Sequence, residues 1–227
     1  MICEGPTDRT VLEAVLDSYI DDYEPIAIQP PRDAADTEGR KRGTGWKGVR
    51  AWCTSEVSSN KDGWSTLLEN TDLLIIQLDA DVAAEPQINR AKPCPPAADS
   101  ANEVRGLILQ WLGLNALPGN VVLCVPSMAS ETWALVSLFP KNPAVVACDR
   151  QRAGGVCIEC RTDIKSILRR AGRRLSPKLV VSQDGGLKNQ AAGYRAVQER
   201  MTIGWPKVVA SCGEAARFDT ELRAATP

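Results

Sequence analysis

The stretch of sequence that decides the fold is Leu73-Leu74-Ile75-Ile76-Gln77-Leu78-Asp79-Ala80-Asp81. Its first six residues are almost entirely apolar, which is typical of a central strand in a parallel sheet, because such a strand is buried on both faces. Asp79 and Asp81 follow at once, so we expect this acidic pair at the carboxyl end of the strand. If the extended backbone continues through Ala80, both Asp side chains lie on the same side.

Two more apolar stretches are closely followed by acidic residues. Met1 to Cys3 predicts a short strand, which leads into Glu4-Gly5-Pro6-Thr7-Asp8 and a helix that begins near Thr7. Residues 120–125 predict another buried strand, and the helix expected after it, over residues 127–138, carries Glu131 in its first turn. Neighbouring parallel strands lie about 4.8 Å apart and end at one edge of a sheet, so we expect these carboxylates to converge.

A cluster of carboxylates repels itself unless cations fill it, and hard oxygen ligands favour Mg²⁺ or Mn²⁺. The sequence therefore predicts a divalent-cation site whose candidate ligands are Glu4, Asp8, Asp79, Asp81 and Glu131. The alternative is that these residues are solvated carboxylates of turns and helix starts, because an acidic first turn favours any helix.

Apolar strands that alternate with helices predict an α/β fold with a mostly parallel sheet flanked by helices. We expect a further strand at Pro25–Ile28 and a long, basic, Gly-rich loop over residues 30–63. Residues 1–140 would form the core of one domain, and residues 141–227 a basic, mainly helical extension that completes it. Elements expected after the loop are a helix at 101–112, an edge-like strand at 156–159 and helices near 162–173, 188–201 and 212–224.

The chain contains no histidine, which excludes every mechanism that needs an imidazole base or ligand. Its eight cysteines are dispersed and several lie in apolar runs, so we expect buried, reduced thiols. Only Cys157 and Cys160 have the spacing of a metal knuckle, and without a second pair we expect no zinc site. We find no segment typical of a membrane span and no signal peptide, so we expect a cytoplasmic protein without a membrane partner.

The net charge of −1 hides an uneven distribution along the chain. Acidic residues dominate the front half, whereas Lys and Arg dominate from about residue 149 to residue 207. An acidic half that contains carboxylate clusters beside an Arg-rich half suits a metal site that faces a polyanion. Arg residues that merely solvate helix faces would give the same composition.

In order and spacing, these motifs resemble the TOPRIM domain shared by topoisomerases, bacterial primases and the nucleases of the OLD family. The resemblance rests on Glu4-Gly5 with Asp8 four residues after Glu4, then on Asp79-x-Asp81, then on a Ser/Glu element matched by residues 127–131. It covers the chain to about Phe139 and is strongest for the OLD-type nucleases. Two departures are a first strand shorter than usual and the lack of a Walker A sequence.

The resemblance implies a standalone TOPRIM-like, and hence Rossmann-like, protein in which Asp8, Asp79, Asp81 and Glu131 bind one or two divalent metals. It implies that Glu4 ligates metal or acts as a general acid or base. The family's downstream lysine is matched best by Lys188, with Lys165 and Lys207 as alternatives. Because the ATPase half of OLD proteins is missing here, any ATPase would be a partner protein in trans.

By the same analogy, a nucleic acid would be held by the basic segment whose candidate residues are Arg40, Lys41, Arg42, Trp46 and Lys47. Trp46 and this segment would otherwise cap a sheet edge, while Trp52, Trp111 and Trp133 are expected in the core. The function expected is a Mg²⁺- or Mn²⁺-dependent nuclease on DNA or RNA, an effector in bacterial or phage-conflict defence. The alternatives are a non-catalytic metal- and nucleic-acid-binding module and a phosphotransfer enzyme on a small nucleotide.

Overall fold

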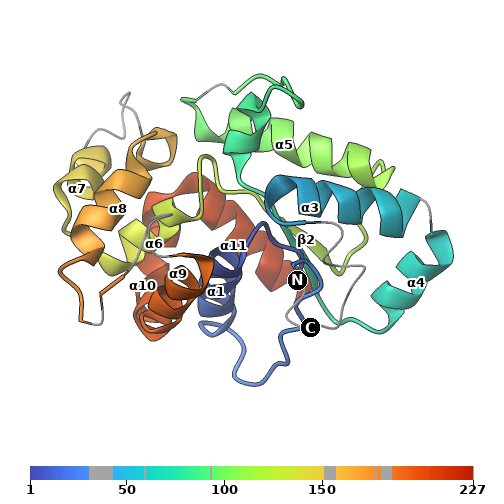
Figure 1. The fold of residues 1–227 in the computed structure, drawn as a ribbon, viewed down its shortest axis with the longest axis horizontal. Helices are drawn as coiled ribbons and strands as arrows, with labels where there is room; N and C mark the ends of the chain where they lie inside the picture. Colours follow the sequence, from blue (N-terminus) through green and yellow to red (C-terminus); the bar gives the residue numbers. More distant parts are fainter. Residues whose placement is uncertain are drawn as a thin grey trace.

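The fold is mixed α/β and mostly helical (Figure 1). The computed structural model describes residues 1–30, 43–58, 60–92, 94–150, 157–176, 178–179 and 186–226 of the 227-residue chain. Its two strands are β1 (Leu74–Gln77) and β2 (Val121–Cys124), and its short helices are η1 (Cys53–Ser58, a π-helix), η2 (Ala80–Ala84) and η3 (Ile158–Cys160), both 3₁₀. The α-helices in the described ranges are α1 (Pro6–Leu16), α3 (Gly45–Trp52), α4 (Lys61–Glu69), α5 (Ala97–Leu112), α6 (Glu131–Leu138), α7 (Pro143–Arg150), α8 (Ile164–Gly172), α9 (Gly186–Arg195), α10 (Gln198–Ser211) and α11 (Gly213–Ala225).

The sheet is parallel, as expected, but it is smaller than the sequence predicts. β1 and β2 pair in parallel with Leu74 opposite Val121. Ile2 forms one parallel bridge to Ile76 of β1 and another to Gln29. The expected strand at residues 1–3 is thus reduced to Ile2, and residues 25–28 form no strand, because the bridge lies one residue later, at Gln29. The backbone bonds from Ile2 N–H to Ile75 O (2.9 Å) and from Gln77 N–H to Ile2 O (2.8 Å) fix this register.

Helices cover both faces of the sheet, which explains why every position of both strands is buried. Leu74 and Ile76 pack into one core cluster with α3 and α5, whereas Ile75 packs into a second cluster with α1 and α6. In Figure 1, α3, α4 and α5 gather at one side of the molecule and α6 to α10 at the other. Trp52, Trp111 and Trp133 are all buried in these clusters, as predicted.

The last two described helices pack on the sheet layer and on the helices that cover it. α10 lies against α1 and α6, and α11 contacts β2 and α5. At the centre of this packing the ring of Trp133 on α6 stacks on Phe218 of α11, with centroids 5.9 Å apart, and meets Trp205 of α10 edge-on.

Half of the loop expected over residues 30–63 is helical, so that prediction was wrong for the described part of it. After Gly43 and Gly45, both with positive φ, residues 45–52 form α3, and η1 and the start of α4 follow. Val49 and Trp52 are completely or almost completely buried. Their three-residue spacing is helical, but the glycines and lysines around them obscured it. Residues 31–42 lie outside the described part of the chain.

Two further expectations were wrong. The strand expected at 156–159 is, in its described part, the 3₁₀ helix η3, because Cys160 N–H bonds back to Cys157 O (3.0 Å) rather than to a neighbouring strand. The cysteines are not all reduced, since Cys94 and Cys160, 66 positions apart, form a disulfide. Sequence spacing carries no sign of this pair, because tertiary packing alone brings the two together. Among the described helices, none is both long and apolar enough to cross a bilayer.

The closest approach of α6 and α10 provides a test of this packing. A Cβ on Gly204 of α10 would lie only 2.5 Å from the carbonyl oxygen of Ser137 on α6. We expect Gly204→Ala to lower the free energy of unfolding by about 1–3 kcal/mol, because the clash outweighs the better helix propensity of alanine. The free energy of unfolding is measured by urea denaturation.

The matched control is Gly106→Ala on α5, where a new Cβ meets no atom within 4 Å. This variant should gain about 0.5–1 kcal/mol from helix propensity alone. Equal stabilisation of both variants would contradict the close packing of α6 on α10.

Candidate active site

The five predicted acidic residues come together at the carboxyl edge of the sheet, and we call them the acidic cluster. Glu4 follows the bridged residue Ile2, and Asp8 lies in the first turn of α1. Asp79 directly follows Leu78 at the end of β1, Asp81 lies in η2, and Glu131 is the first residue of α6. Three chain segments that run in parallel therefore deliver these side chains to one edge, as the sequence predicts.

Hydrogen bonds tie the acidic cluster together. Oε1 of Glu4 accepts the backbone N–H of Asp79 (2.7 Å), which joins the first chain segment to the end of β1. Oδ1 of Asp79 accepts the backbone N–H of Ser130 (3.2 Å), and the Ser130 hydroxyl donates to Oδ1 of Asp8 (2.6 Å). Ser130, within the predicted Ser/Glu element, thus links two of the carboxylates.

Gln77 is a supporting residue that the sequence prediction overlooked. Its side chain is 1% exposed on an otherwise apolar strand. It donates through Nε2 to Oδ1 of Asp79 (2.8 Å) and accepts the backbone N–H of Glu4 through Oε1 (3.0 Å). The sequence did contain a sign of this role, because Gln77 is the one amide in the apolar run from Leu73 to Leu78. A buried amide needs hydrogen-bond partners.

Burial and mutual repulsion hold protons on the acidic cluster. Burial, together with the charges of Asp8 and Asp81, raises the pKa of Glu4 to about 8. Burial raises the pKa of Glu131 to about 7 even though Lys165 opposes the shift. For Asp79, burial and then the charges of the other four carboxylates raise the pKa well above its usual range. A buried group of like charges disfavours the ionised state in this way.

Lys165 on α8 is the described lysine that touches the acidic cluster. Its Nζ lies 3.9 Å from Oε2 of Glu131, and its side chain is half exposed. Burial lowers the pKa of Lys165, but the carboxylates of the acidic cluster, with Glu131 and Asp79 first, together raise it above its ordinary value. The lysine predicted first, Lys188, belongs to α9, and its side chain lies outside the described part of the structure. Lys207, the third alternative, lies on α10.

Tyr194 on α9 is a second residue that the sequence prediction missed. Its side chain is 2% exposed, and its hydroxyl has no hydrogen-bond partner among the described residues. Burial raises the pKa of Tyr194 well above its usual range, and the charges of Glu131, Asp8 and Asp79 raise it further. A buried donor without a partner beside carboxylates is suited to a bound water or ligand oxygen. No sequence pattern singles out this tyrosine.

The oxygens of the acidic cluster fit a hard divalent cation by chemistry and charge. In this structure, however, no three described acidic or thiol side chains are spaced as direct ligands of one ion. Oxygens of Glu4, Asp79 and Asp8 are occupied by donors of the protein itself. A cation would therefore be held after these side chains turn, or through waters, several of which Mg²⁺ usually keeps.

The described part of the predicted nucleic-acid segment lies next to the acidic cluster. The backbone N–H of Gly45 donates to the carbonyl oxygen of Glu4 (2.8 Å), which places the start of α3 there. Trp46 packs partly buried on one core cluster, and Nζ of Lys47 lies 5.5 Å from its ring centroid. Arg40, Lys41 and Arg42 lie outside the described residues.

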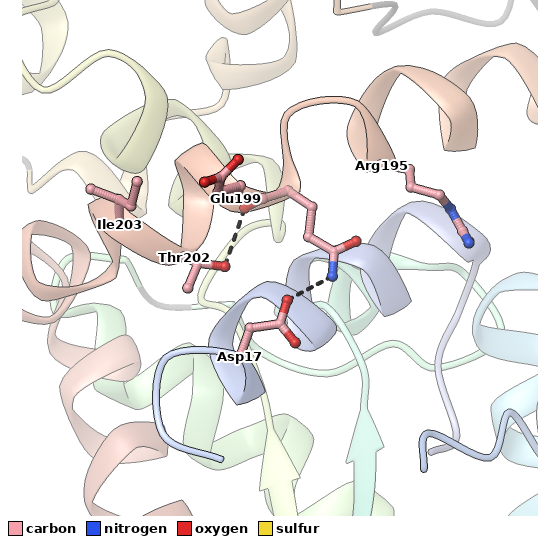
Figure 2. A pocket seen from close by; sticks show the side chains of 6 residues that line it. Asp17, Arg195, Glu199, Thr202 and Ile203 are labelled. Atoms are coloured by element: carbon pink, nitrogen blue, oxygen red, sulfur yellow. Dashed lines mark hydrogen bonds between the residues drawn. The ribbon is translucent and has the colours of Figure 1, made fainter. Parts of the chain in front are cut away.

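A surface pocket between α1 and α10 lies at the other end of α1, away from the acidic cluster (Figure 2). Asp17 and Glu199 contribute its acidic side chains and Arg195 its basic one. Asp17 accepts a hydrogen bond from the side chain of Gln198 (2.8 Å). Because Asp17, Gln198 and Thr202 already bond to one another and the other two charged residues come from the surface of α9 and α10, this pocket is a weaker candidate than the acidic cluster.

The raised pKa values predict how stability depends on pH. In metal-free protein, Glu4 and Glu131 keep protons up to about pH 8 and pH 7, whereas in the unfolded chain they lose them near the ordinary glutamate pKa of 4.5. The folded state therefore binds more protons between these values, and the free energy of unfolding falls as pH rises from 5 to about 8. Melting temperature against pH measures this slope, and Glu4→Gln should flatten it.

A bound cation competes with these protons, so Mg²⁺ or Mn²⁺ should raise the melting temperature more at pH 8 than at pH 5.5. A melting temperature that rises through this range without metal, or equal metal effects at both pH values, would contradict the electrostatics described for the acidic cluster.

Comparison with models of protein families, with curated proteins and with solved structures gives no match for this chain. The geometry of the acidic cluster is therefore the basis on which a function is assigned.

Proposed function

We propose that this chain is a divalent-metal-dependent nuclease of TOPRIM type that hydrolyses phosphodiester bonds of DNA or RNA. The observation that carries the proposal is the meeting of five carboxylates from parallel chain segments at one sheet edge, beside one lysine. Buried carboxylates that repel one another destabilise a fold, and a site that binds cations explains their presence.

The roles follow from position in the acidic cluster. Asp8, Asp79, Asp81 and Glu131 would hold the cation, which when bound lowers the pKa of water and polarises the phosphodiester. Glu4 bonds to Asp79 N–H through one oxygen, so its second oxygen is the one we assign to proton transfer. We assign the neutralisation of charge on the reacting phosphate to Lys165, and the donation of a hydrogen bond to that phosphate or its water to Tyr194.

The exposed face of the α8 region supports a polyanionic substrate. From Lys165 it continues over four exposed arginines, which are Arg169, Arg170, Arg173 and Arg174. Positions 165, 169 and 173 are four residues apart, so on a helix they form one basic stripe that begins at the acidic cluster. A phosphate backbone laid along this stripe would reach the carboxylates at its end.

A second candidate is a non-catalytic module that binds metal and nucleic acid within a larger complex. The observation that favours it is the occupation of cluster oxygens by the protein's own donors, with no three side chains arranged as direct ligands in the described chain. A partner ATPase acting in trans would then rearrange the cluster. That partner, and a role in phage-conflict defence, come from the resemblance to OLD-type nucleases.

Cleavage assays separate these two functions. Purified protein is incubated with supercoiled, linear and single-stranded DNA and with RNA, in Mg²⁺ or Mn²⁺. We expect cleavage of at least one substrate, and Asp79→Asn should lower the rate at least 100-fold by removing a charged metal ligand.

The matched control is Asp72→Asn, an exposed aspartate just before the other end of β1. It should leave the rate unchanged. Metal-dependent nucleic-acid binding without turnover, in the wild type and both variants, would instead support the non-catalytic module.

Tyr194→Phe tests the assignment of the buried hydroxyl. Removing a buried donor that has no partner should stabilise the metal-free protein by up to about 1–3 kcal/mol. The same change should slow cleavage about tenfold or more, because the hydrogen bond to the reacting group is lost. Denaturant unfolding and the cleavage rate give the two readings, and an unchanged rate would remove Tyr194 from the site.

A further inference from the structure

Three cysteines that the proposed nuclease function does not use bring their sulfurs together before α8. Cys94 and Cys160 form the disulfide, and the thiol of Cys157 donates a hydrogen bond to Sγ of Cys160 over 3.5 Å. We call Cys94, Cys157 and Cys160 the sulfur triad. Disulfides exchange when a third sulfur attacks one of their two sulfurs, so a thiol held this close to one end of the bond is placed to react with it.

Cys157 has the properties of the attacking sulfur. It is half-buried, so water can take up its proton. Burial and the charge of Glu159 raise the pKa of Cys157, and hydrogen bonds from the backbone N–H groups of Glu159 and Cys160 limit this rise. These two donors stabilise the thiolate, which is the form that attacks. The C-x-x-C spacing of Cys157 and Cys160 is also that of redox-active pairs.

Cys94 has the properties of the leaving sulfur. The hydroxyl oxygen of Ser127, a residue that is 1% exposed, lies 3.4 Å from Sγ of Cys94. A disulfide sulfur carries no proton, so the hydroxyl is the donor of this pair, with the carbonyl oxygen of Ala97 (3.3 Å) as its other acceptor. A hydroxyl that can turn its proton toward Cys94 stabilises a thiolate there, because hydrogen bonds to charged groups are the stronger ones.

Cys160 is the sulfur that the two others share. It is 8% exposed, whereas Cys94 and Cys157 are both half-buried, so a reagent in solution reaches those two more easily. The turn that carries Cys160 is anchored by Glu159, whose carboxylate accepts the backbone N–H of Gly213 (2.6 Å) at the start of α11. The shared sulfur is therefore fixed in position between the two that compete for it.

We propose that the sulfur triad is a thiol–disulfide exchange site, in which Cys157 displaces Cys94 from its bond to Cys160. The Cys157 thiol gives its proton to water, its sulfur forms a bond to Sγ of Cys160, and the bond from Cys160 to Cys94 breaks. The electron pair of the broken bond stays on Cys94, whose thiolate then takes up a proton. One disulfide replaces another, so no outside oxidant or reductant is consumed.

The exchange changes which parts of the chain are covalently joined. The Cys94–Cys160 bond connects the segment before α5 with the turn that leads into α8, across 66 positions of sequence. A Cys157–Cys160 bond stays within that turn. Exchange therefore frees the segment before α5 from α8, the helix that carries Lys165, while the chain keeps the same number of disulfides.

The test starts from the full chain, purified without reductant, whose thiols are trapped with an alkylating reagent over time. Peptide mass spectrometry without reduction then gives the pairing, because trypsin leaves Cys157 and Cys160 on one peptide and Cys94 on another. We expect two populations in the wild type. In one, Cys157 is alkylated and Cys94 is bonded to Cys160. In the other, Cys94 is alkylated and Cys157 is bonded to Cys160.

Variants identify the attacking sulfur. Cys157→Ser removes it, so the alkylated fraction of Cys94 should fall about tenfold or more while the Cys94–Cys160 bond stays intact. Cys53→Ala is the matched control, because Cys53 is a buried free thiol in the other core cluster, and this variant should give the wild-type fractions.

The measurement on the wild type does not depend on the folding of a variant. A wild-type chain in which Cys94 is never alkylated, or in which Cys160 takes part in no disulfide, would overturn the proposal. Equal alkylation of Cys94 in Cys157→Ser would do the same, because a different sulfur would then be the attacker. These readings involve neither metal nor nucleic acid, so they are independent of the nuclease assay.

Discussion

The rest of the structure depends on the burial of β1 on both faces. Leu74 and Ile76 face one core cluster and Ile75 the other, so helices must cover the strand on each side. Ile2 pairs with one edge of β1 and β2 with the other. A strand placed in this way has only its two ends near solvent, and its carboxyl end is where the acidic residues gather.

The acidic cluster opposes the stability that this burial provides. Asp79 is buried and Glu4 half-buried, so water solvates their charges poorly, and the described cations nearby are fewer than the carboxylates. Gln77 and Ser130 offset part of the cost, since each supplies hydrogen bonds to more than one residue of the site. A fold that retains such an arrangement concentrates negative potential at one place on its surface.

Elements that a local run of residues encodes could be predicted from the sequence, whereas features that depend on the surrounding structure could not. β1 and β2 were predicted because local apolar runs encode them, and the convergence of Glu4, Asp79 and Glu131 followed from the parallel order alone. The strands expected at residues 1–3 and 25–28 did not form, and only Ile2 and Gln29 make bridges, because turns or a helix begin within a few residues of each. Helix α3 was not predicted because the glycines before it are typical of a loop, whereas here they only form the turn at its start.

The residues that were missed reach the site through tertiary packing. Tyr194 was missed, and Lys165 was named only as an alternative to Lys188. Both come from helices whose positions depend on α1 and α6, far away in sequence, so no local pattern connects them with Asp79. The same is true of Cys94 and Cys160. Whether the acidic cluster forms part of a TOPRIM fold stays a prediction, as do the roles of Lys188 and the basic residues 40–42.

The disulfide also affects the unfolded chain. It closes a loop of 66 residues that contains β2 and α6, and so contains Glu131, while α8 with Lys165 begins four positions beyond its end. Closing a loop of this length removes conformational entropy from the unfolded ensemble worth about 4 kcal/mol. Part of the order of the site therefore comes from the limited freedom of the denatured chain.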